Sequence, residues 1–208
     1  MGEVVHLALD LAGLIPVIGE IADLTNGVIY TIEGNGVDAA LSYASAIPVA
    51  GWFSASVKFA KKGIALADGT KTTFKWIKRT DNLINFGDRG QLRKVLGLAK
   101  GDLRIAHHII PWEHGVDDVV QEAAKGNNAF HLNELLNGIP LTSIQHSGSH
   151  SLYSARVKAH LTSIKNNLVS SGNFNPTSAR EAIQDLINNV IKPAIASQPN
   201  TPINQIVF

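Results

Sequence analysis

Five polar residues between positions 107 and 150 are of the types that build a hydrolytic metal site: His107, His108, Asn137, His146 and His150. The i, i+4 spacing of His146 and His150 brings two imidazoles to one side of a segment that enters a helix. A nitrogen from His107 would make three protein ligands and leave a position open for water or a phosphate oxygen. The spacing therefore predicts a catalytic divalent-ion site.

His108 stays outside this ligand set and is available as a general base. An imidazole with a pKa of about 6.5 can take a proton from water at neutral pH. On a regular strand His107 and His108 would point to opposite faces, so we expect a twisted or bulged strand end before Pro111. In this interpretation one histidine binds the ion while its neighbour activates the water.

Composition limits the alternatives. The chain has 208 residues and no cysteine, which excludes disulfides, thiolate nucleophiles and Cys-ligated zinc. Residues 1–57 hold six acidic residues and no Lys or Arg, whereas residues 58–100 hold eleven Lys or Arg and three acidic residues. A basic block in a nearly neutral chain indicates either a polyanion partner or a solvated face. We find no signal peptide and no uninterrupted apolar run long enough to cross a membrane.

Three segments are predicted along the chain. Residues 1–69 form a helical module with two Ile-Pro-Val turns, "LIPVIG" and "AIPVAG", and its last helix is expected from about residue 52 to 67. Residues 70–100 form a basic connector with a strand within "DGTKTTFKWIKRT" and a short helix over 89–98. Residues 101–208 carry strands at "LRIAHHII" and "NGIPL" and helices over about 115–126, 149–172 and 176–195. Pro193 is expected to kink or end the last helix.

The pattern "AHHIIPWE … NGIPL … HSGSHSLYSARV" resembles the AHH nuclease toxin family of the HNH/endonuclease VII superfamily, over about residues 103–168. The resemblance implies an α+β fold: a helical module, then a ββα-metal (treble-clef) core with flanking C-terminal helices. It implies that His107 and the helix-borne His146 and His150 bind the ion, with His150 favoured if only one of that pair does. It also implies that His108 activates water and that Asn137 orients His108, with Asn133 as the alternative.

The first half resembles the pre-toxin modules of bacterial polymorphic toxins. Together the two resemblances imply a non-specific endonuclease, acting on DNA rather than RNA, with a divalent ion (Mg, Mn, Zn or Ni). They imply a secreted or delivered effector that acts in the cytoplasm of a target cell. The expected partners are nucleic acid, a cognate immunity protein, and a larger parent toxin or delivery-system component.

Cationic residues outside the histidine cluster are candidates for phosphate contacts. They are Arg104, Arg156, Lys71, Lys75, Lys78 and Arg79. Contacts to the backbone alone read little sequence and weaken with salt, so low sequence specificity is expected.

Two other functions are compatible with the same residues. Residues 1–67 could act on membranes, with the histidines serving as structural zinc ligands. Alternatively, a closed zinc site with four protein ligands, including His131, could stabilise a binding module without catalysis. His6, His114 and His160 are expected to be ordinary surface or core histidines.

Overall fold

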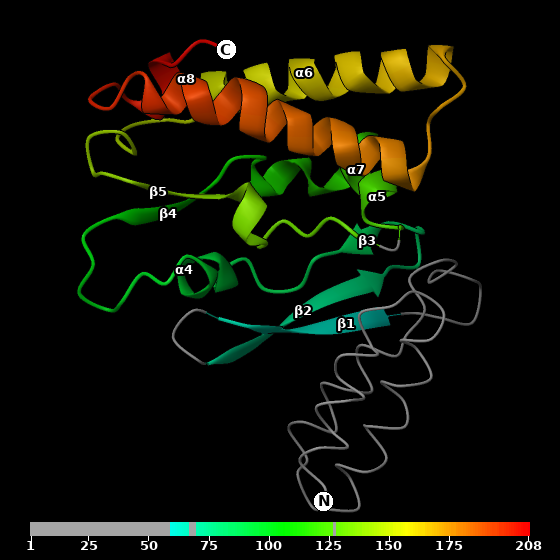
Figure 1. Cartoon of the computed structure of the whole chain (residues 1–208), viewed down its shortest axis with the longest axis horizontal. Coiled ribbons are helices and arrows are strands. Elements are labelled where there is room, and N and C mark those ends of the chain that lie inside the picture. The colour runs from blue at the N-terminus through cyan, green and yellow to red at the C-terminus, as the bar shows by residue number, and fades with distance from the viewer. Residues whose placement is uncertain (1–58, 67–69, 127) are drawn as a thin grey trace, which may run out of the picture.

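The computed structural model describes residues 59–66, 70–126 and 128–208. It is an α+β fold with a three-stranded sheet, a two-stranded sheet and helices that cover them (Figure 1). The mixed class agrees with the one predicted. The Ile-Pro-Val turns and the helices predicted before residue 59 lie outside the described residues. No helix in the described ranges is both long enough and apolar enough to span a bilayer.

The first sheet joins β1 (Phe59–Ala65), β2 (Lys71–Lys78) and β3 (Ile84–Asn85) in that order. β1 pairs antiparallel with β2, with Phe59 opposite Ile77 and Ala65 opposite Lys71. The predicted helix over about 52–67 is therefore wrong for Phe59–Ala65. Pairing with β2 decides the conformation of this segment, and strand formation depends on such neighbours more than on local preference.

β2, which the sequence predicted as a strand, alternates between a buried and an exposed face. Phe74 and Trp76 are each 2% exposed, and Trp76 Nε1 donates a hydrogen bond to the Phe130 carbonyl at 2.9 Å. Residues of the expected basic connector thus belong to the same hydrophobic core as the residues after 101. The division of the chain at residues 69 and 100 stays a prediction.

The helix expected over 89–98 is shorter in the structure, where α4 spans Gln91–Val95. It packs directly on the second sheet at Gly138. A Cβ at that glycine would meet Leu92 Cδ1 at 2.8 Å and Leu96 Cδ2 at 2.9 Å, so a larger residue would force these leucine side chains to shift.

The central ββα unit consists of β4 (Ile105–His108), β5 (Gly138–Leu141) and α6 (Ser151–Ser170). β4 and β5 pair antiparallel in unbroken register, with His107 opposite Ile139 and His108 opposite Gly138. The bulge expected at the doublet is therefore absent from the described pairing. The doublet therefore lies on a regularly paired strand.

Between the two strands the chain forms a covering element, η1 (Trp112–Val116) and α5 (Asp118–Ala123), where the sequence predicted one helix over 115–126. Asp117 caps α5 by accepting a hydrogen bond from the Val119 amide at 3.0 Å. Its other carboxylate oxygen lies 2.6 Å from Lys158 Nζ, which ties α5 to α6. η2 (Leu135–Asn137) then leads into β5.

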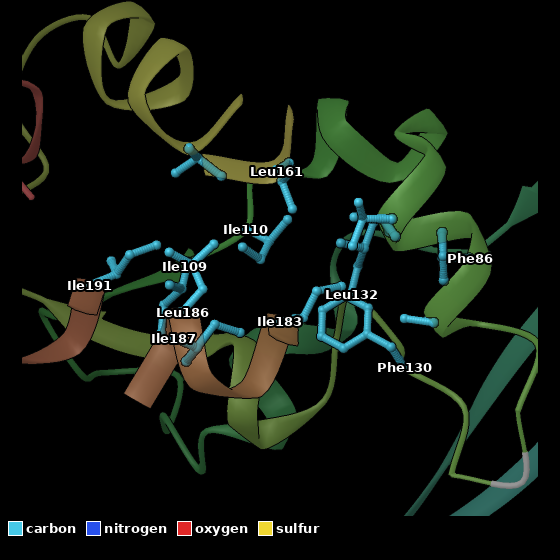
Figure 2. Packing of buried hydrophobic residues seen from close by; sticks show 14 of the residues in the cluster. Phe86, Ile109, Ile110, Phe130, Leu132, Leu161, Ile183, Leu186, Ile187 and Ile191 are labelled. Carbon is cyan, nitrogen blue, oxygen red and sulfur yellow. The ribbon is translucent and has the colours of Figure 1, made fainter. Parts of the chain in front are cut away.

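The C-terminal helices α7 (Pro176–Asp185), η3 (Leu186–Ile191) and α8 (Lys192–Ala196) follow one another without a break. η3 is a π-helical turn that ends two residues before Pro193. This wider turn is the local distortion that accommodates a proline without an amide donor. In Figure 2, Ile109 and Ile110 lie among Leu161 of α6 and the isoleucines of α7 and η3. The core therefore sits directly behind the histidine doublet.

Candidate metal centre and base

His107, His146 and His150 converge in the structure. One potential ligand atom from each lies within 4.8 Å of the others. The ring centroids are 5.4 Å apart for His107 and His146, 5.3 Å for His107 and His150, and 4.3 Å for His146 and His150. The structure thus brings both members of the His146 and His150 pair to His107.

The loop between β5 and α6 carries two of these residues. His146 closes a helical turn through its amide hydrogen bond to the Thr142 carbonyl at 3.0 Å, and His150 is the N-cap residue of α6. Gly148 between them has φ +76°, which allows the chain to reverse. The expectation that both histidines are borne by a helix is therefore wrong. They precede α6, because the helix begins only at Ser151.

The donor atoms suit a divalent ion. His107 is 6% exposed, and its Nε2 has no hydrogen-bond partner within the described ranges. Burial, together with the neighbouring His146 and His150, lowers the pKa of His107 to about 3. Burial and the nearby His150 also lower the pKa of His146. Neutral imidazoles present lone pairs, which are the form that binds a metal.

His108 faces a different set of partners. Its Nε2 lies 3.0 Å from Asn133 Oδ1, and its ring is in edge contact with Trp112 at 5.4 Å between centroids. Asn133 Nδ2 donates to the Asp88 carbonyl at 2.7 Å, so Asn133 turns its oxygen toward His108. An amide oxygen only accepts, so His108 carries its proton on Nε2 and its lone pair on Nδ1.

The Asn137 side chain directs its hydrogen bonds to backbone groups and not to His108, which corrects the role expected for it. Its Oδ1 accepts from the Ile110 amide at 2.7 Å, and its Nδ2 donates to the Leu132 carbonyl at 2.9 Å. These bonds hold the backbone just after the doublet. The imidazole of His108 is oriented by Asn133, the alternative kept from the sequence.

A cleft of about 810 Å³ opens over these residues and holds both histidines of the doublet together with His146 and His150. Its lining also contains residues that the sequence analysis did not select: Arg89, Arg93, Trp112, Glu113, Tyr153 and Ser154. Arg89 and Arg93 belonged to the basic block but carried no motif. Only their placement in three dimensions identifies them.

None of the six predicted cationic contacts lines the described cleft. Arg104 pairs with Asp102 at 2.7 Å, Arg79 pairs with Asp81 at 2.9 Å, and Arg156 Nη1 donates to the Asn204 carbonyl at 3.0 Å. Lys71 and Lys75 lie on the exposed face of β2, and Lys78 lies at its end. Any phosphate contact that these residues make would therefore lie outside the cleft.

Ile203 and Asn204, near the C-terminus, bind the backbone of the loop between β5 and α6 and of the first residues of α6. Asn204 Oδ1 accepts hydrogen bonds from the amides of Leu152 at 2.7 Å and Tyr153 at 3.1 Å, at the start of α6. The neighbouring Ile203 amide donates to the Gln145 carbonyl at 2.7 Å. Tyr153 packs against His107 and donates to the Ile109 carbonyl at 2.7 Å. Burial raises the pKa of the Tyr153 phenol, so this residue acts as a donor.

His131 has a structural environment in the core. It stacks on Phe74 at 4.3 Å between centroids, its Nε2 lies 3.1 Å from the Lys75 carbonyl, and its Nδ1 accepts from the Asn133 amide. Burial lowers the pKa of His131 to about 3. Because both ring nitrogens are engaged, His131 does not supply a fourth metal ligand.

A comparison with protein-family models matched residues 99–191 to the AHH family, described as a nuclease family of the HNH/ENDO VII superfamily with conserved AHH. The match covers the doublet, both strands of the ββα unit, α6 and α7. Neither a search of curated proteins nor a search of solved structures found a match.

Proposed function

We propose, on the premise that this chain belongs to the AHH nuclease family through residues 99–191, that it is a metal-dependent endonuclease that hydrolyses phosphodiester bonds. The match of residues 99–191 to this family supports nuclease chemistry in general. The observation that supports metal dependence is the convergence of His107, His146 and His150 beside His108, which stays outside the ligand set, in one cleft.

The residues of the cleft divide into a ligand set and a base. His107, His146 and His150 would hold a divalent ion, whose chemistry is to stabilise negative charge on the scissile phosphate and on the leaving oxygen. His108 accepts a proton from the attacking water at Nδ1. Asn133 holds the imidazole in the required tautomer, and the edge contact with Trp112 restricts its rotation.

Burial of His107 and His108 favours the neutral form that each role requires. It lowers the pKa of both His107 and His108, which keeps the ligand and the base neutral before reaction. The hydrogen bond to Asn133 acts in the opposite direction on the pKa of His108, so it favours the imidazolium that forms when the proton arrives.

The biological setting belongs to the same proposal. We take the substrate to be DNA, read through its backbone with little sequence preference. We take the protein to be the toxic part of a delivered bacterial effector that acts in the target-cell cytoplasm, with an immunity protein and a larger parent toxin as partners. The support is the resemblance of residues 1–67 to pre-toxin modules and of the doublet region to nuclease toxins.

One experiment tests the proposal. The purified chain is incubated with supercoiled plasmid and with total RNA, in EDTA and then with Mg, Mn, Zn or Ni restored. We expect no cleavage in EDTA and nicking of the plasmid once an ion is added. Undiminished cutting in chelator would exclude metal dependence, and degradation of RNA alone would replace the DNA assignment.

A further inference from the structure

Arg89 lines the cleft of the histidine cluster although it precedes the residues that match the nuclease family. It lies between β3 and α4, two residues before the helix begins. The same cleft is lined by His107, His146 and His150 of the ligand set and by His108, so Arg89 shares one opening with the ligand set and the base. A cation therefore borders the position that a phosphate would take.

The guanidinium of Arg89 differs from those of neighbouring arginines in its partners. Arg93 donates to the carbonyl oxygens of Ala99, Asp102 and Arg104, and Arg104 pairs with Asp102. Arg89 is exposed, and its side chain makes no hydrogen bond or ion pair with any residue that the structure describes. Its five donors remain available to a ligand.

The backbone that carries Arg89 is fixed to the catalytic machinery. The Asp88 carbonyl accepts the hydrogen bond from Asn133 Nδ2, the same amide group that orients His108. Asp88 Oδ1 also accepts from the Gly90 amide at 2.8 Å, which closes the turn around Arg89. The Arg89 side chain thus has no protein partner among the described residues, while the backbone next to it is hydrogen-bonded through Asn133 to His108.

We propose that Arg89 binds a substrate phosphate, so that the segment before residue 99 completes the nuclease site. This inference rests on the proposed function. A guanidinium forms paired, charge-assisted hydrogen bonds with two phosphate oxygens, a geometry that a lysine ammonium does not reproduce. Because Arg89 and His108 line the same cleft, a phosphate held by Arg89 would lie in the cleft that contains the proposed base.

The test compares the full chain with its Arg89→Ala and Arg89→Lys variants. Binding of a short fluorescent DNA duplex is measured by anisotropy in EDTA at several salt concentrations, which separates binding from cleavage. We expect Arg89→Ala to bind at least about tenfold more weakly, with a salt dependence lower by about one phosphate contact. Arg89→Lys should fall between Arg89→Ala and the parent. In cleavage assays with metal, the loss should raise KM more than it lowers kcat.

The control is Lys125→Ala, which removes one positive charge at the end of α5, where Lys125 pairs with Glu122 away from the cleft. This variant should bind like the parent. If Arg89→Ala also binds and cleaves like a parent chain that is active, the inference about Arg89 is overturned while the proposed function stands. If the parent neither binds nor cleaves nucleic acid, the proposed function itself fails.

Discussion

Asn133 and His108 are separated by 25 residues in the chain, yet Asn133 Oδ1 lies 3.0 Å from His108 Nε2. The other end of the Asn133 amide donates to the Asp88 carbonyl, so the amide cannot flip without losing that bond. This arrangement selects the tautomer of His108 and places its lone pair on Nδ1.

Replacing Asn133 with alanine should lower kcat by about 10- to 100-fold, because His108 would lose the partner that fixes its tautomer and orientation. Steady-state nicking of plasmid measures the effect. Asn137→Ala is the comparison, since the Asn137 side chain hydrogen-bonds to backbone groups and not to the imidazole. That variant should instead lose roughly 1–3 kcal/mol of unfolding free energy. Equal kcat for Asn133→Ala and the parent would remove Asn133 from the mechanism.

His108→Ala and His107→Ala should have different effects although the two residues are adjacent. His108→Ala should lose about 10²- to 10⁴-fold in cleavage rate and retain affinity for Zn or Ni, because only the base is removed. His107→Ala should lose both metal affinity and cleavage. Calorimetric metal titration and plasmid nicking measure the two properties. A His108→Ala chain that cuts as well as the parent would eliminate the base assignment.

Zn or Ni should stabilise the folded chain, since the three imidazoles meet only after folding. At an ion concentration about 100 times the dissociation constant, the expected gain is ~2.7 kcal/mol. Thermal melts with and without the ion measure it, and Mg should give a smaller shift because it prefers oxygen ligands. Single alanine variants at His146 and at His150 decide between two ligands and one. If neither variant reduces the shift, the ion binds elsewhere.

Asn204→Ala should destabilise the protein by about 1–2 kcal/mol, because the amides of Leu152 and Tyr153 would lose their acceptor at the start of α6. Urea unfolding measures the change. Asn204→Asp keeps the acceptor oxygen and adds a favourable negative charge at a helix N-terminus, so it should be close to the parent. Similar losses in both variants would show that the cap is not the reason.

Stability of the metal-free chain should fall in acid because of His131. Its folded pKa, about 3, lies below the unfolded value, so between these two values the unfolded chain binds the extra proton. The unfolding free energy therefore rises with pH in this window. His131 contributes a fall of about 1.4 kcal/mol per pH unit as the pH drops below about 6.5, and His107, whose pKa is also lowered to about 3, contributes in the same direction. His131→Gln should reduce this slope without abolishing it, measured by urea unfolding from pH 7 to pH 4, and an unchanged slope would contradict the assignment.

Local patterns in the sequence were sufficient to predict much of the site. The alternation within "DGTKTTFKWIKRT" predicted β2, the segments "LRIAHHII" and "NGIPL" predicted β4 and β5, and the helical periodicity after His150 predicted α6. The histidine spacing predicted the ligand set that the structure brings together. These features depend on residues close in the chain or on a motif whose members fold into one ββα unit. They can therefore be predicted from the order of residues alone.

Other features were decided only by tertiary structure. β1 forms because β2 lies beside it, and His108 contacts Asn133 rather than Asn137 because the loop before β5 turns toward Asp88. Arg89 and Asn204 reach the site from segments outside the family match. Neither residue has a distinctive neighbourhood in the sequence. The strength of a hydrogen bond or of a charge interaction depends on the distance between its atoms in space. Packing of the core fixes that distance, and the number of residues between the partners along the chain does not.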